Sequence, residues 1–305
     1  WSSDVCSSDL KMNKKWITLI FAALMMVGAA TSAYSSSPSG AGEMPPEQET
    51  QQLARQIDAW IGQLAKEKGF AGWEGAAWRK YPLGPGQHGW AVIVTAADGE
   101  ELGYLVVSAN QEDAGYTLME YGTGGLPLFS PETLERALES EQLKEEGVSF
   151  TDQAAIERWY IGGAQALWKV TESGVTRFAD AKSGIWLPID EADAPLDPPL
   201  QPLSRKPEHF PEPRHILIQP ADPYESIAWL DAPAANIRDW ASFLRWLQAS
   251  DGEGIYASQG FTGAALTPMG VAGFHWWASG SYVAVEQEGL RYIPLERLLT
   301  EGRFH

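Results

Sequence analysis

Residues 90–121, WAVIVTAADGEELGYLVVSANQEDAGYTLMEY, decide the expected fold. Three short runs of alternating side chains are separated by a turn at Asp98-Gly99 and a longer one from Asn110 to Gly115. Glycine permits the positive φ that tight hairpin turns need, so this segment predicts three consecutive antiparallel strands. Both faces of the runs are largely apolar, which predicts that other elements cover both faces of the sheet.

Helices are expected on either side of these strands. Apolar residues with helical spacing precede them and predict a helix that Gly69 can close: Leu53, Ile57, Trp60, Ile61 and Leu64. A further strand is predicted over residues 77–81. After the three strands, Ser130 and Pro131 have the sequence pattern of a helix N-terminus, and the helix is predicted to continue to about Leu143.

A second group of strands is predicted over residues 156–161, 164–171, 175–180 and 185–189, with turns that contain glycine between them. The glycine-rich run that begins at Gly122 lacks both the third dinucleotide glycine and the Lys-Ser/Thr of a phosphate-binding loop. The sequence therefore argues against nucleotide binding.

Seven prolines lie between Ala192 and Pro213, which predicts a stiff linker over residues 191–213. The alternative is a strap packed over the preceding domain.

The region beyond the linker, residues 214–305, is predicted to begin with a strand at 215–219 and a helix capped by Asn236 and bearing Trp240 and Leu244. Four strands and a short helix are predicted to follow: strands at 254–257, 271–277, 282–285 and 290–293, and the helix at 295–299. The predicted fold class is α+β, with antiparallel sheets, packed helices and two domains, residues 51–190 and 214–305.

The N-terminal residues predict export. Residues 1–11 resemble translated adapter sequence and are interpreted as a non-native leader. Residues 12–33 have the pattern of a signal peptide, with Lys14 and Lys15 before an apolar run and a cleavage site of small residues ending at Ala33. Residues 34–50 predict a disordered tether. We expect a secreted or extracytoplasmic protein, at a Gram-positive cell surface or in the medium; the alternative is an uncleaved membrane anchor.

Charge and cysteine content restrict the possible partners. The formal net charge is −18, which argues against nucleic acid and against anionic lipid or wall polymer held by simple electrostatics. No stable membrane insertion is expected once the signal is cleaved. The only cysteine is Cys6, inside the leader, so the mature chain has no disulfide, thiolate nucleophile or cysteine-ligated metal.

No catalytic motif is present: the chain lacks HExxH, a nucleophile elbow and an EF-hand loop. We assign no catalytic residue, no metal ligand and no cofactor. Carboxylates occur in three clusters that could bind Ca²⁺ or act as acid-base pairs, although solvated surface is the simpler interpretation: Glu112-Asp113, Asp190-Glu191-Asp193 and Glu286/Glu288.

His275 and Trp277, in the run GFHWW at 273–277, are the candidate binding residues. In a strand, Phe274 and Trp276 share one face, which we expect to meet the helix carrying Trp240, while His275 and Trp277 share the other. Trp277 would then be free to contact a glycan or peptide. The alternative is that His275 and most of the 14 tryptophans are structural.

Two segments resemble known exported modules. Residues 166–189, ALWKVTESGVTRFADAKSGIWLPI, resemble the PepSY type of module, and residues 103–125, GYLVVSANQEDAGYTLMEYGTGG, are similar to the pro-regions of streptopain-like cysteine peptidases. Both resemblances imply a non-catalytic module that accompanies or inhibits extracellular peptidases. The helix-then-sheet order of residues 214–305 resembles papain-like peptidases, but the nucleophilic cysteine is missing, which implies an inactive relative.

The sequence thus predicts an exported, non-catalytic binding module that interacts with or inhibits an extracellular peptidase. Two alternatives stay open. One is a degenerate or unrecognised hydrolase, and the other is binding of cell-wall glycan through exposed tryptophans.

Overall fold

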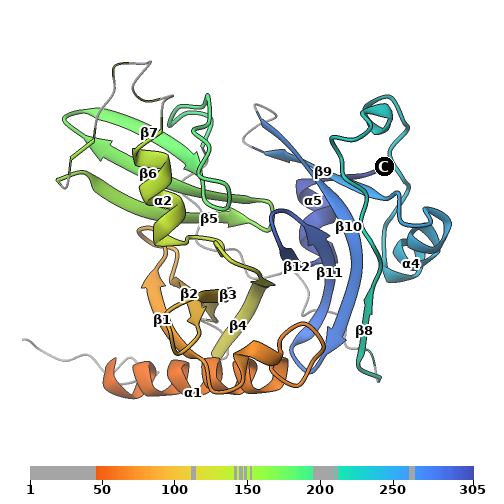
Figure 1. Cartoon of the computed structure of the whole chain (residues 1–305), viewed down its shortest axis with the longest axis horizontal. Helices are drawn as coiled ribbons and strands as arrows, with labels where there is room; N and C mark the ends of the chain where they lie inside the picture. Colours follow the sequence, from red (N-terminus) through yellow and green to blue (C-terminus); the bar gives the residue numbers. More distant parts are fainter. Residues whose placement is uncertain are drawn as a thin grey trace, which may run out of the picture. The chain divides into compact units, whose positions relative to one another are not determined.

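A computed structural model describes residues 46–110, 115–140, 143, 147, 150–151, 153–194, 210, 212–260 and 265–305 (Figure 1). The predicted leader and signal peptide, most of the tether and linker, and the pair Glu112-Asp113 lie outside the described residues.

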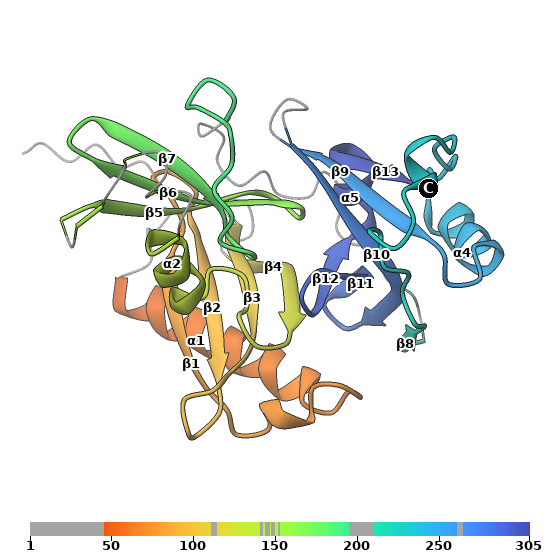
Figure 2. The ribbon, with the colours of Figure 1, turned by 45° about the horizontal axis from the view of Figure 1, so that its top comes forward.

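The strands predicted over residues 90–121 are confirmed. They are β2 (Gly89–Thr95), β3 (Glu101–Asn110) and β4 (Gly115–Thr123), and β1 (Ala77–Pro82) pairs with β2, all antiparallel. Helix α1 (Pro46–Leu64) lies along one face of these strands (Figure 2). Leu53 and Ile57 of this helix pack with Val92 and Leu105. The helix begins four residues before the predicted end of the tether, because proline is well tolerated in a first helical turn.

The opposite face of these strands is also covered, as predicted. Helix α2 (Pro131–Leu138) packs there, together with a second sheet of β5 (Ala155–Gly162), β6 (Gln165–Glu172) and β7 (Val175–Asp180). The helix ends before the predicted Leu143. The fourth strand predicted in this region is reduced to one isolated bridge, between Trp186 and Ala179.

The C-terminal region is built mainly of antiparallel strands. Its elements are β8 (Arg214–Leu217), α4 (Trp240–Ala249), β9 (Ile255–Gly260), β10 (Ala265–Trp277), β11 (Gly280–Glu286), β12 (Leu290–Pro294), α5 (Leu295–Glu301) and β13 (Gly302–Phe304). A short 3₁₀ helix, η2 (Ala228–Leu230), lies between β8 and α4, and another, η1 (Ala71–Trp73), lies between α1 and β1 in the N-terminal region. Helix α4 is capped by Asp239 rather than Asn236, because Asp239 and Ser242 form a reciprocal capping box.

The N- and C-terminal strands form one sheet, in the order β1-β2-β3-β4-β12-β11-β10-β9-β13, with β8 paired to β10. The junction is the antiparallel pairing of β4 with β12, in which Tyr121 lies opposite Tyr292 and Gly122 opposite Arg291. Gly122 is required there, since a Cβ atom would collide with the Tyr104 ring. Pro45–His305 form one compact unit. The α+β class is confirmed, and the division into two domains is not.

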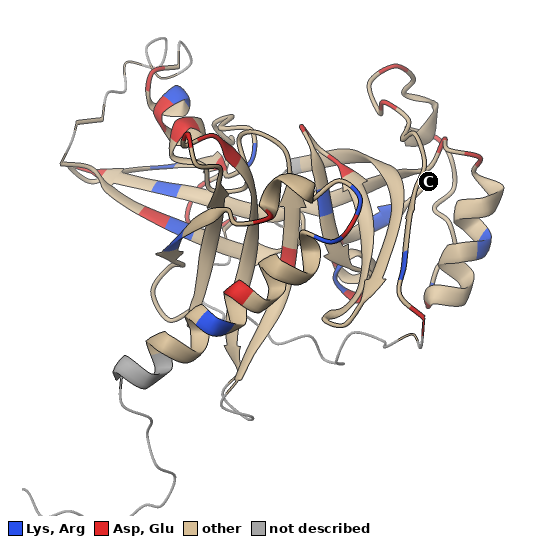
Figure 3. Ribbon diagram, turned by 60° about the horizontal axis from the view of Figure 1, so that its bottom comes forward, with Lys and Arg blue, Asp and Glu red and all other residues tan. Residues whose placement is uncertain are grey.

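Charged side chains are spread over helices, strands and loops of this unit (Figure 3). Among the described residues, no helix combines the length and the apolarity needed to cross a membrane.

Candidate metal centre

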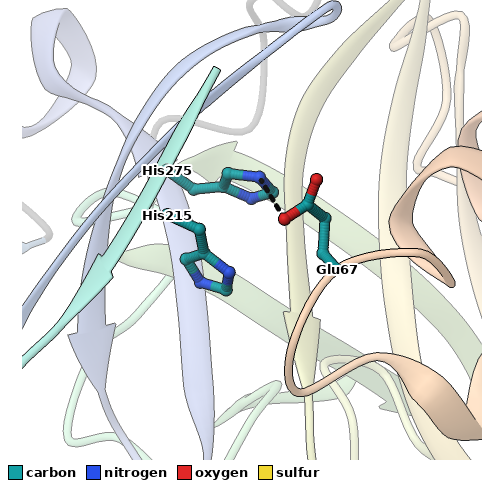
Figure 4. Close-up of side chains that lie close together, drawn as sticks. All are labelled: Glu67, His215 and His275. Atoms are coloured by element: carbon teal, nitrogen blue, oxygen red, sulfur yellow. Dashed lines mark ion pairs between the residues drawn. The ribbon is translucent and has the colours of Figure 1, made fainter. Parts of the chain in front are cut away.

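Three potential metal ligands that are distant in the sequence meet beside the junction of β4 and β12. Glu67 follows α1, His215 lies on β8 and His275 lies on β10 (Figure 4). His215 and His275 are directly opposite each other in the β8–β10 ladder, which places their side chains on the same face. Their imidazole rings stack with centroids 4.3 Å apart.

The ligand atoms of the three residues all lie within 4.8 Å of one another. The Nε2 atom of His275 is 4.0 Å from Oε2 of Glu67. Zinc ligands at bond lengths near 2.1 Å in a tetrahedral arrangement are about 3.4 Å apart. Since Glu67 is on a surface segment and its side chain is 35% exposed, a small movement of that side chain would close the site.

Two tyrosines orient the imidazoles. The Tyr121 hydroxyl is 2.7 Å from Nδ1 of His275, and the Tyr292 hydroxyl is 2.9 Å from Nε2 of His215. The two tyrosine rings, opposite each other across β4 and β12, stack at 4.7 Å. Each imidazole therefore uses one ring nitrogen for a tyrosine and keeps the other for a further partner.

For His275 that other nitrogen, Nε2, is buried and has no hydrogen-bond partner among the described residues. Burial, together with a smaller contribution from the neighbouring His215, lowers the pKa of His275 to about 3. Burial also lowers the pKa of His215. Both imidazoles are neutral near neutral pH, and neutral imidazole is the form that binds metals.

Two imidazoles and one carboxylate suit zinc and related divalent transition metals. The hydrogen bonds from the tyrosines correspond to the outer contacts that fix histidine ligands in metal sites. The donor set therefore fits a metal with three protein ligands.

The two candidate binding residues have different outcomes. His275 lies in the cluster, but the predicted exposure of Trp277 is wrong. Trp277 is only 7% exposed, because its ring packs beside Tyr121 and stacks on His275. Trp276 is also 7% exposed and contacts Trp240 on α4, as predicted. The adjacent tryptophans therefore do not form an exposed platform.

The sequence-based prediction missed Glu67 and His215. Neither belongs to a spaced motif, and 148 residues separate them in the chain. The available signal was weak: each of the two histidines stood in a predicted strand, but nothing indicated that those strands pair.

A second buried cluster lies on the other face of the β4–β12 junction, around Glu120 and Arg291. The Nε and Nη2 atoms of Arg291 are each 2.8 Å from Oε1 of Glu120, and Nη2 also donates to the Gly163 carbonyl at 2.6 Å. The Tyr104 and Tyr160 hydroxyls donate to Glu120 as well. This cluster is hydrogen-bonded throughout, which indicates a structural role.

In the two carboxylate clusters that the structure describes, Asp190 and Glu286 make local turn contacts, and Glu191 pairs with Lys169. Asp190 accepts the backbone N–H groups of Ala192 and Asp193, and Glu286 accepts that of Gly289. These contacts are typical of turn stabilisation rather than of ligand binding.

No protein-family model, curated protein or solved structure matches the chain. The chemistry of its own residues therefore carries the functional argument.

Proposed function

We propose that the protein is a metal-binding module in which Glu67, His215 and His275 bind one divalent transition metal, with zinc the best fit. The observation that carries this proposal is the buried Nε2 of His275, which has no hydrogen-bond partner in the described part of the chain and lies 4.0 Å from the Glu67 carboxylate. Leaving a buried polar atom without a partner costs about 1–3 kcal/mol. A metal ion would give this nitrogen a partner.

The tyrosines define how each histidine would bind. When Nδ1–H of His275 donates to the Tyr121 hydroxyl, the lone pair of Nε2 is free for the metal. When Nε2–H of His215 donates to the Tyr292 hydroxyl, Nδ1 is the nitrogen left for coordination. Glu67 supplies the negative charge. The bound metal would supply a divalent positive charge that links three separate chain segments.

The experiment is calorimetric titration of chelator-treated full chain with Zn²⁺. We expect one zinc per chain and a loss of affinity of at least about tenfold in Glu67→Gln, His215→Ala and His275→Ala. Tyr121→Phe and Tyr292→Phe should weaken binding by about 10–100-fold, the usual effect of losing an outer contact.

The matched control is His88→Asn, because His88 is exposed and asparagine tolerates its positive φ of 45°. Titration with Co²⁺ reports geometry, since a tetrahedral site gives intense visible absorption. Absence of zinc binding, or binding unchanged in all three ligand variants, would overturn the proposal.

We further propose that this module acts outside the cell as a non-catalytic partner of an extracellular protein, with a secreted peptidase as the first candidate. The support is the export pattern of residues 12–33, the resemblance of residues 166–189 to PepSY-like modules and the similarity of residues 103–125 to pro-region modules. Inhibition assays with secreted peptidases test this directly, and a pull-down on purified cell wall tests the glycan alternative.

A further inference from the structure

Strand β8 is attached to the sheet with little burial of apolar side chains. It has four residues, and it pairs with residues 273–276 of β10, outside the main strand order of the sheet. Arg214, Ile216 and Leu217 are exposed, the last two by 45% and 41%. Only His215 is partly buried, so apolar burial contributes little to the attachment of β8.

Backbone contacts hold the rest of this segment. Gly273 of β10 has φ +131°, and a Cβ atom there would collide with the Ile216 carbonyl. A Cβ atom at Gly270 would likewise collide with the Ala221 carbonyl. These two glycines allow the backbone to approach β10 closely, and the Ile218 N–H donates to the Ala272 carbonyl at 2.9 Å.

A metal in the proposed centre would join β8 to β10 directly. His215 and His275 are cross-strand partners, so coordination by both would bridge the two strands at their paired positions. A ligand that binds only when β8 is paired with β10 lowers the equilibrium constant for detachment of β8 by a factor of 1 + [L]/Kd, where [L] is the free ligand concentration. The attachment of β8 would therefore depend on the metal concentration.

We propose that the metal fastens β8 to β10, and that the β10 edge uncovered without metal accepts an extended segment of a partner protein by strand addition. This inference rests on the proposed metal-binding function. An open edge presents unpaired backbone N–H and C=O groups, which extended peptides recognise.

The structure also indicates which segment would fit this edge. Gly270 and Gly273 leave room for a closely approaching backbone. The position opposite His275 is occupied by a flat ring, that of His215, which stacks on His275 and lies 6.2 Å from the Phe70 ring. The partner is therefore an extended segment with a flat side chain at that position followed by apolar residues, as Ile216 and Leu217 follow His215 in β8 itself.

Hydrogen exchange of the full chain tests the metal dependence. With free zinc at about 100 times its Kd, exchange of those amides of residues 214–218 that donate to β10, such as that of Ile218, should slow about a hundredfold relative to chelator. His275→Ala should abolish this effect, and the amides of β2 serve as the internal control. If calorimetry shows zinc binding but β8 exchange does not change, the strand-fastening proposal is wrong and the metal centre stands. If zinc does not bind, both proposals fail.

A labelled peptide tests the acceptor edge. The probe has the sequence of residues 213–219 with His215→Phe, which keeps a flat ring but cannot bind metal. Its fluorescence anisotropy should show binding at least about tenfold tighter in chelator than in zinc, and a scrambled peptide should not bind. The full-chain variant His215→Ala, whose own β8 is weakened, should bind the peptide equally under both conditions. Absence of binding to this variant would overturn the strand-addition proposal.

Discussion

Two buried polar clusters lie on opposite faces of the same pair of strands. On β4, Glu120 points to one face and Tyr121 to the other; on β12, Arg291 and Tyr292 do the same. The Glu120–Arg291 cluster finds its partners within the protein. In the cluster around Tyr121 and Tyr292, Nε2 of His275 has no hydrogen-bond partner among the residues that the structure describes.

This difference separates a structural role from a binding role. A buried ion pair with all its hydrogen bonds made has nothing left to offer a ligand, and removing one member leaves an uncompensated charge. A neutral imidazole with a free ring nitrogen can instead bind a partner that comes from outside the protein. The predictions below test this distinction, beginning with the effect expected to be largest.

The largest effect should follow from dividing the chain within the linker. Fragments 46–200 and 201–305 should each fail to fold alone, because Glu120 and Arg291 would lie in different fragments and β4 would lose β12. Mixing them should restore the far-ultraviolet circular dichroism of the intact chain. Two fragments that each unfold cooperatively on their own would instead support the two-domain prediction.

Replacing Arg291 should destabilise the protein strongly. Arg291→Met leaves the Glu120 carboxylate buried without its cation, which should lower the free energy of unfolding by about 3–5 kcal/mol in urea titrations. The double variant Arg291→Met/Glu120→Gln should recover part of that loss. Arg303→Met, at an exposed position, is the control and should change stability by less than about 0.5 kcal/mol. A double variant no more stable than Arg291→Met would contradict the argument.

The two adjacent tryptophans should be equally important for stability and differ in metal binding. Both are buried, so Trp276→Ala and Trp277→Ala should each cost about 3–5 kcal/mol. Of the two tryptophans, only Trp277 stacks on the His275 ring, with ring centroids 5.7 Å apart. Trp277→Phe should therefore weaken zinc binding, and Trp276→Phe should leave it unchanged. Equal zinc affinities in the two phenylalanine variants would show that Trp277 does not support the site.

Local sequence patterns predicted the elements but not their partners. Alternation identified the strands of residues 90–121, and strand periodicity placed Trp276 against Trp240 correctly. The pairing of β4 with β12 joins residues about 170 positions apart, and no local pattern encodes it. The β-bulge between Val271 and Gly273 also has no local signal, and it shifts Val271 to the face of Phe274.

Two of the three candidate metal ligands, Glu67 and His215, were missed for the same reason. Glu67, His215 and His275 meet only because the two halves share one sheet. The prediction of separate domains placed Glu67 and the two histidines in different units, so a common site was never considered. A prediction of two separate domains therefore gave no reason to expect these three residues at one site.

The smallest effect concerns Glu301, a carboxyl outside both clusters whose side chain is only 11% exposed. Burial raises the pKa of Glu301 from 4.5 to about 7. Between these values the folded state binds more protons than the unfolded state, so this residue makes stability fall as pH rises, by at most about 3 kcal/mol.

Glu301→Gln mimics the neutral acid and keeps an acceptor for the Ala164 N–H group. The variant should match the parent in urea titrations at about pH 4 and be more stable by about 1–3 kcal/mol at about pH 8. Glu135→Gln, at an exposed position on α2, should show no such pH-dependent difference. If Glu301→Gln is less stable than the parent at the higher pH, the ionised carboxylate must instead be stabilised by its neighbours, and Glu301 would belong with the structural ion pairs.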